Sequence, residues 1–325
     1  MYLLVQWLSY LIFSGIVFGI TWLSLLSAMN SGHYVSLVLK ALIFLLITFQ
    51  VFYEGYKLWQ KRQEIQTKDF QIKEDIINFI SLILGAMLTF FVSAQFGLNA
   101  VLVSGFVGLS ASILFPKYQI AIYCGSFAGM ASGILFGHSG WILVSSLFTA
   151  LLFVFSREVY SGFGGKLGAS AFWGTLITAL LAGCYHQTVL ELEIVVQWEV
   201  ILYFVLGAIF TNQLHLFSKK STVFTSGIFG VIAGILLPIF YPEEGLMLAA
   251  ALFSGTFIGM TKVERFDKSI YYLLASIFGG IIFIYSQTYF NGLGGKLGAI
   301  AFISSLAVAS LRQIVGLAMK KAAGK

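Results

Sequence analysis

The stretch GFGGKLGASAF at positions 162–172 returns almost unchanged as GLGGKLGAIAF at positions 292–302. The two stretches lie 130 positions apart and share Gly-x-Gly-Gly-Lys-Leu-Gly-Ala-x-Ala-Phe. A shared motif of this length is hard to attribute to chance, even in an apolar chain. It indicates that the sequence contains an internal duplication.

Three further pairs of blocks extend this duplication. LGAMLT at 84–89 matches LGAIFT at 206–211, and SGFVGLSASILFP at 104–116 matches SGIFGVIAGILLP at 226–238, both at a shift of 122 positions. GSFAGM at 125–130 matches GTFIGM at 255–260 at the shift of 130, so an insertion of eight residues separates the two shifts. The blocks keep the same order in both halves, which favours a true repeat.

The composition places the chain in a membrane. Hydrophobic residues make up 59% of it and charged residues only 10%, whereas a soluble domain has about 25% charged residues. Apolar runs long enough to cross about 30 Å of hydrocarbon predict twelve spans. They cover 3–29, 34–58, 76–97, 99–115, 118–137, 141–157, 167–185, 196–217, 222–240, 245–261, 269–289 and 297–317.

The basic residues predict the orientation. If the N-terminus is cytoplasmic, every Lys and Arg except Lys40 and Lys296 falls in or beside a cytoplasmic segment, as the positive-inside rule requires. Both termini are therefore predicted to be cytoplasmic. The net charge of +6 is then an orientation signal, and we expect the lipid bilayer rather than a nucleic acid as the partner of this surface.

These observations predict an all-α integral membrane protein with an N-terminal hairpin and two five-helix repeats. An odd number of spans per repeat makes the second repeat enter the membrane from the opposite face, so the repeats have inverted topology. The predicted units are a transmembrane hairpin at 1–59, a charged cytoplasmic linker at 60–75, repeat A at 76–185, and repeat B at 196–325 with a short basic tail. The hairpin is also a candidate surface for a homo-oligomer.

Inverted repeats are typical of secondary transporters and of some channels. We therefore predict transmembrane movement of a small solute, with a weak preference for an anion, at the interface of the repeats; carrier and channel both stay open. The alternative is a non-transporting membrane protein, either an assembly scaffold or an intramembrane enzyme acting on a lipid-linked substrate. We expect no enzyme, cofactor or metal site, because no catalytic constellation or metal-ligand spacing is recognisable.

The two Gly-Gly-Lys loops are the first candidate solute site. Each precedes the last span of its repeat, so free N–H groups, the positive end of a helix dipole and a lysine converge there and would attract an anion. The topology places the first loop on the cytoplasmic side and the second on the outer side, as inner and outer vestibules. The alternative is a glycine turn whose lysine snorkels to lipid or caps the preceding helix. The residues are Gly164, Gly165 and Lys166 with Gly294, Gly295 and Lys296.

Small residues inside four repeated spans form a second candidate set. They allow either close helix packing, or interrupted helices whose free backbone groups bind the solute. No Asp or Glu lies clearly at mid-membrane in the repeats, so coupling of transport through a buried acid has no support. The set is Ser104, Gly105, Gly108, Ser226, Gly227, Gly230, Gly125, Ser126, Gly129, Gly255, Thr256 and Gly259.

Overall fold

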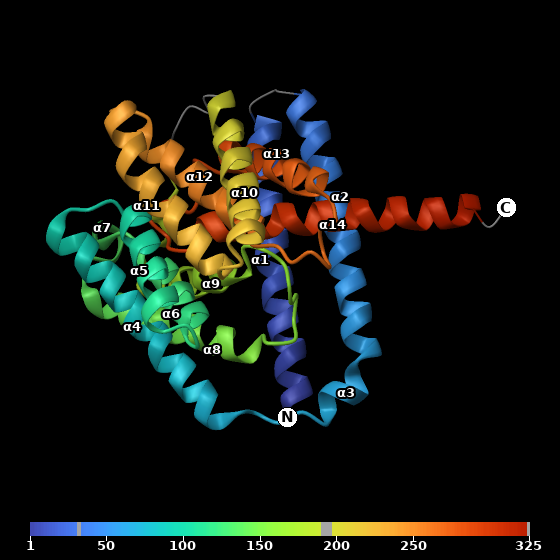
Figure 1. Cartoon of the computed structure of the whole chain (residues 1–325), viewed down its shortest axis with the longest axis horizontal. Coiled ribbons are helices and arrows are strands. Elements are labelled where there is room, and N and C mark those ends of the chain that lie inside the picture. The colour runs from blue at the N-terminus through green and yellow to red at the C-terminus, as the bar shows by residue number, and fades with distance from the viewer. Residues whose placement is uncertain (31–33, 190–196, 324–325) are drawn as a thin grey trace.

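The computed structural model describes residues 1–30, 34–189 and 197–323, and within these ranges the chain forms helices and no strand. Figure 1 shows the arrangement. The helices are α1 (Tyr2–Asn30), α2 (Tyr34–Gln60), α3 (Arg62–Gln66), α4 (Ile72–Phe96), α5 (Ala100–Leu114), α6 (Gln119–Gly129), α7 (Gly133–Phe136), α8 (Ser139–Phe155), α9 (Lys166–Leu181), the 3-10 turn η1 (Tyr185–Thr188), α10 (Trp198–Ser218), α11 (Thr222–Phe240), α12 (Gly245–Gly259), α13 (Ser269–Tyr285) and α14 (Lys296–Ala323).

Six of these helices are long and apolar enough to cross a membrane, and five shorter helices are also apolar. Large apolar side chains such as Leu84, Phe106 and Leu202 are more than half exposed on the outside of the bundle. A water-soluble protein rarely exposes apolar surface so widely. The chain is therefore a helical integral membrane protein, as its composition predicts. The six long segments are Tyr2–Leu23, Lys40–Gln60, Ile72–Phe96, Trp198–Ser218, Thr222–Phe240 and Lys296–Met319.

The single span predicted over 118–137 is wrong, because the helix breaks after Gly129. α6 has 11 residues, which is about 16 Å of helix and roughly half of the hydrocarbon thickness. The backbone N–H of Ser132 donates to the carbonyl of Gly292 at 2.8 Å, and the Ser132 hydroxyl accepts from the N–H of Ile134 at the start of α7. After Gly129 the backbone therefore bonds to a segment distant in the sequence and does not continue the helix.

Glycines set the distance between neighbouring helices. α5 packs on α11 where a Cβ on Gly105 would lie 2.8 Å from the carbonyl carbon of Gly230, and one on Gly227 would lie 2.8 Å from the nitrogen of Leu109. α6 packs on α4 where a Cβ on Gly129 would lie 2.9 Å from Cβ of Thr89. Such approaches exclude any side chain, and small residues are known to permit them between membrane helices.

Positions 130 apart in the sequence make the same local contacts. The N–H of Lys262 donates to the carbonyl of Gly162 at 3.0 Å, as Ser132 donates to Gly292. Two side chains reach equivalent carbonyls as well. Cys124 Sγ donates to the carbonyl of Leu167 at 3.3 Å, and Ser254 Oγ donates to the carbonyl of Leu297 at 2.7 Å.

The N-terminal helices pack into the molecule along one side. α1 and α2 run side by side in Figure 1, where the C-terminal part of α14 projects away from the other helices. Phe13 on α1 is fully buried, and its ring centroid lies 5.6 Å from that of Phe302 on α14. Ser14 and Tyr160 share a hydrogen bond of 3.0 Å. The hairpin therefore supports the segment between α8 and α9.

Candidate functional site

The two Gly-Gly-Lys segments meet in the interior. A Cβ on Gly168 would lie 2.5 Å from Cα of Gly298, and the reverse substitution would make the same clash. Likewise a Cβ on Gly165 would collide with the carbonyl of Gly298, and one on Gly295 with that of Gly168. Segments in contact cannot lie on opposite faces of a bilayer about 30 Å thick. The predicted separation into an inner and an outer loop is therefore wrong.

Backbone conformation explains this inward course. The chain leaves α8 and α13 and turns back toward the interior before α9 and α14 begin. Gly165 and Gly295, at the two N-caps, have φ of 79° and 81°, in the left-handed region that glycine adopts without steric cost. Two helix N-termini, each with four N–H groups outside the helical ladder, consequently start beside each other.

Each lysine binds the end of the helix that precedes it. Lys166 Nζ donates to the carbonyl of Ser156 at 2.5 Å, and Ser156 is the C-cap of α8. Lys296 Nζ donates to the carbonyl of Ser286, the C-cap of α13, at 2.7 Å and to that of Tyr289 at 2.5 Å. A cation at a helix C-terminus is stabilised by the helix dipole, so both lysines act as caps.

Two cavities flank the paired segments. We call them the Lys166 cavity, with a volume of ≈ 370 Å³, and the Lys296 cavity, with a volume of ≈ 340 Å³, each after the lysine in its wall. Both lysines are partly exposed, so they keep part of their surface toward these spaces while they cap α8 and α13. Arg157 and Lys262 also line the Lys166 cavity, and Gln287 and Asn291 line the Lys296 cavity. Among the described residues, no Asp or Glu lines either one.

Phe127 and Phe257 are the two residues that both cavities share. Phe127 lies near the end of α6 and Phe257 near the end of α12, at equivalent places in the repeated GSFAGM and GTFIGM blocks. Each is 2% exposed, and their ring centroids are 4.8 Å apart. Tyr123 and Phe253 pack beside them with centroid distances of 4.4 Å and 4.7 Å. We call these four residues the aromatic cluster.

Buried hydroxyls next to the aromatic cluster bond to one another in two groups. Ser104 and Ser126 share a hydrogen bond of 2.8 Å, and Ser226 and Thr256 share one of 2.7 Å. The Tyr123 hydroxyl joins Ser226 at 2.8 Å, which links α6 to α11. These hydroxyls therefore satisfy one another, as buried polar groups generally must.

The predicted site residues thus fall into two groups. Those in the cavity walls are Gly164, Gly165 and Lys166 on one side and Gly295 and Lys296 on the other. Those outside both walls, where they pack against neighbouring backbone or side chains, are Gly294, Ser104, Gly105, Gly108, Ser226, Gly227, Gly230, Gly125, Ser126, Gly129, Gly255, Thr256 and Gly259. The binding of solute by either group stays a prediction.

Sequence reasoning missed Phe127 and Phe257 as site residues. Both are the shared Phe of the repeated Gly-x-Phe-x-Gly-Met block, but a phenylalanine in an apolar span is normally interpreted as a packing residue. It missed Arg157 and Lys262 because their charges were assigned to the membrane surface. The equivalence of the two phenylalanines was the signal that could have identified them.

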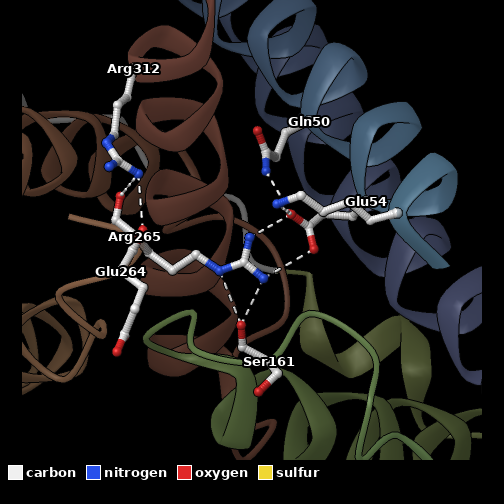
Figure 2. Close-up of polar contacts among 7 residues, drawn as sticks. Gln50, Glu54, Ser161, Glu264, Arg265 and Arg312 are labelled. Atoms are coloured by element: carbon white, nitrogen blue, oxygen red, sulfur yellow. Dashed lines mark hydrogen bonds and ion pairs between the residues drawn. The ribbon is translucent and has the colours of Figure 1, made fainter. Parts of the chain in front are cut away.

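An ion pair holds α2 against the rim of the Lys166 cavity (Figure 2). Glu54 is 8% exposed and accepts two hydrogen bonds from Arg265, of 2.6 Å and 3.1 Å. The same guanidinium donates to the carbonyl of Ser161, which lines the cavity, at 2.8 Å and 3.1 Å. Gln50 Nε2 donates to Glu54 at 3.1 Å. A bidentate, largely buried pair of this kind fixes geometry well.

Arg312 on α14 holds the 260–268 segment that carries Arg265. It donates to the carbonyls of Glu264 and Arg265 at 3.0 Å and 3.1 Å, and Figure 2 shows both bonds. Its Nε lies 3.0 Å from Asp267 Oδ1, and hydrogen bonding to Arg312 lowers the pKa of the Asp267 carboxyl. The rim of the Lys166 cavity is therefore tied to both α2 and α14.

The described residues contain no group of three or more His, Cys, Asp or Glu that could hold a metal ion. The two cysteines, Cys124 and Cys184, are both free and buried. No protein-family model, curated protein or solved structure matches the chain.

Proposed function

We propose that the protein moves a small anionic solute across the membrane between the Lys166 cavity and the Lys296 cavity. The observation that carries the proposal is that the two cavities share Phe127 and Phe257, which occupy equivalent positions in the repeated blocks. Because both cavities end at the same pair of side chains, that pair could close a path between them. Movement of that pair would open the contact at which both cavities end.

The proposed path runs at the interface of two inverted five-helix repeats, 76–185 and 196–325. In the proposal these repeats and the hairpin provide about twelve membrane helices, some of which cross only in part, and both termini are cytoplasmic. Support comes from the contacts that recur 130 positions apart, including the bonds of Lys262 to Gly162 and of Ser132 to Gly292. Inverted repeats place the solute site near the bilayer centre, at ends of interrupted helices.

The charges in the cavity walls favour an anion. Lys166, Lys262 and Arg157 line one cavity and Lys296 lines the other, with no acid in either wall among the described residues. α9 and α14 start at the paired glycine segments, so the positive ends of two helix dipoles lie beside the cavities. A positive field with no carboxylate in the wall attracts anions and repels cations.

Uptake into liposomes that contain the purified protein tests the proposal. Anions and neutral solutes are supplied in turn, for wild type and for Lys166→Gln and Lys296→Gln. We expect protein-dependent uptake of an anion, and a loss of about tenfold or more in each variant, because a charge in a confined site of low dielectric acts strongly. Lys117→Gln is the matched control, because Lys117 is 63% exposed and pairs with Glu74 at 3.0 Å.

Two results would reject the proposal. One is the absence of protein-dependent uptake for every solute when the protein is folded, as judged by a single symmetric peak in gel filtration. The other is unchanged anion uptake in both lysine variants, which would remove the charge argument. If transport is observed, counterflow of labelled against unlabelled solute distinguishes a carrier from a channel, because only a carrier produces counterflow.

A further inference from the structure

The walls of the two cavities and the contact between them differ in chemistry. Cations and amides lie among mainly apolar residues in the walls, while the contact consists only of the rings of Phe127 and Phe257. Met130 lines the Lys296 cavity and Met260 lines the Lys166 cavity, at equivalent positions directly after the two short helices. A solute would therefore move from a space that offers some polar groups, through a contact that offers none, into a second space with some polar groups.

The aromatic cluster offers no hydrogen bond to replace lost water. Of its four side chains only that of Tyr123 has a polar atom, and this hydroxyl is bonded to Ser226 at 2.8 Å. An ion between Phe127 and Phe257 would leave most of its hydration shell without compensation. The cost of this dehydration rises steeply with charge, and it is lower for large monovalent ions than for small or multivalent ones.

The sign of the ion follows from the charges in the cavity walls. Arg157 is balanced by Asp75, at 2.5 Å, but neither Lys166 nor Lys262 forms an ion pair within the described ranges. A cation is repelled by these unpaired charges, so an anion is favoured over a cation.

We infer that the solute is a small, weakly hydrated monovalent anion, and that Phe127 and Phe257 determine this selectivity. The inference rests on the proposed transport function and adds the class of anion. Nitrate and thiocyanate are members of this class; sulfate and hydrogen phosphate are not, because they hold water tightly. Each cavity has room for on the order of ten water molecules, so the ion is hydrated on both sides and dehydrated only between the rings.

Flux from liposomes loaded with one anion at a time tests the inference on the wild-type protein. Nitrate, thiocyanate, chloride, sulfate and phosphate are compared at equal concentration, with urea as a neutral solute. We expect nitrate and thiocyanate to leave at least about tenfold faster than sulfate, because the second charge adds a large dehydration cost. This comparison needs no variant, so misfolding of a mutant cannot obscure it.

The variants Phe127→Ala and Phe257→Ala test the role of the rings. Removal of either ring widens the contact and lets water follow the ion, so the nitrate-to-sulfate ratio should fall by about tenfold while nitrate flux persists. Phe106→Ala is the control, because Phe106 lies on α5 with 60% of its surface exposed, away from both cavities. Phe127→Leu, which keeps an apolar side chain, should retain most of the wild-type ratio.

The outcomes separate the inference from the function on which it rests. Equal fluxes of sulfate and nitrate in wild type, or an unchanged ratio in both folded alanine variants, would overturn the inference and leave transport standing. Flux of urea with no anion flux would show that the solute is not an anion, and would reject that part of both proposals. No flux of any solute by folded protein would overturn transport itself.

Discussion

The ring centroids of Phe127 and Phe257 lie 4.8 Å apart, and each residue is only 2% exposed. The two residues come from α6 and α12, which both end two residues later at a glycine. Because both residues line the Lys166 cavity and the Lys296 cavity, the proposed path depends on this pair.

The contact between Gly168 and Gly298 should be essential for packing of α9 on α14. Gly168→Ala or Gly298→Ala places a methyl group 2.5 Å from the opposite Cα, and backbone cannot give way as a flexible side chain can. Overpacking of this kind costs about 1–3 kcal/mol or more. We expect a clear fall in the thermal unfolding midpoint in detergent. Gly316→Ala, on the same helix with nothing within 4 Å, should melt like wild type.

The Glu54–Arg265 pair should be coupled rather than additive. Glu54→Gln leaves Arg265 largely buried without its partner, and Arg265→Met leaves Glu54 with the longer 3.4 Å contact to Lys57 as its remaining ion pair; each change costs up to about 3–5 kcal/mol, whereas the double variant removes both charges of the pair. The unfolding midpoints of both single variants and the double variant, in a double-mutant cycle, measure this coupling. Strict additivity would contradict the ion pair. Glu64→Gln is the control, since Glu64 is 63% exposed and meets Lys68 only at 3.5 Å.

The hydrogen bond between Tyr123 and Ser226 should stabilise the contact between α6 and α11. Tyr123→Phe leaves a fully buried Ser226 with one partner fewer, and we expect a loss of about 1–2 kcal/mol. Phe occupies the equivalent position 253, so the ring itself is tolerated in the aromatic cluster. A chemical denaturation curve measures the change. An unchanged midpoint would mean that the hydroxyl contributes nothing at this contact.

Cysteine labelling should reveal the inverted sense of the repeats. Lys117 follows α5 and Glu243 follows α11, at equivalent places in the two halves, and both side chains are exposed. In inverted repeats these positions face opposite sides of the membrane. An impermeant maleimide added to intact cells should therefore label Glu243→Cys and spare Lys117→Cys. Cys124 and Cys184 are buried and should not interfere. Labelling of both positions from one side would contradict inversion.

Hydropathy was enough to locate most of the helices. The span predicted at 222–240 coincides with α11, and those at 99–115 and 245–261 differ from α5 and α12 by one or two residues at an end. Apolar runs locate helices in a membrane because every backbone group there must be bonded within its own segment. Four short blocks that each occur twice also drew attention to the Gly-Gly-Lys segments, most of whose predicted site residues line the cavities.

The break after Gly129 and the meeting of the Gly-Gly-Lys segments lay beyond local reasoning. The chain stays apolar through Met130 and Ala131, so hydropathy gives no sign that the helix ends at Gly129. The hydrogen-bond partner of Ser132 beyond this break is Gly292, which is distant in the sequence. Lys296 was assigned to a surface because a lysine inside a membrane is costly. Two carbonyls beyond the end of α13 compensate for that cost, and only the folded chain brings them together.

Reversible cross-linking across the contact tests the central claim most directly. Phe127→Cys and Phe257→Cys are combined with Cys124→Ser and Cys184→Ala; Ser at 124 is acceptable because Ser254 makes the equivalent bond to Leu297. Nitrate flux from liposomes is recorded before and after a short bifunctional thiol reagent, and again after reduction. A path between the two phenylalanines predicts that flux stops with the cross-link and returns on reduction. Full flux through quantitatively cross-linked protein would show that the solute does not pass there.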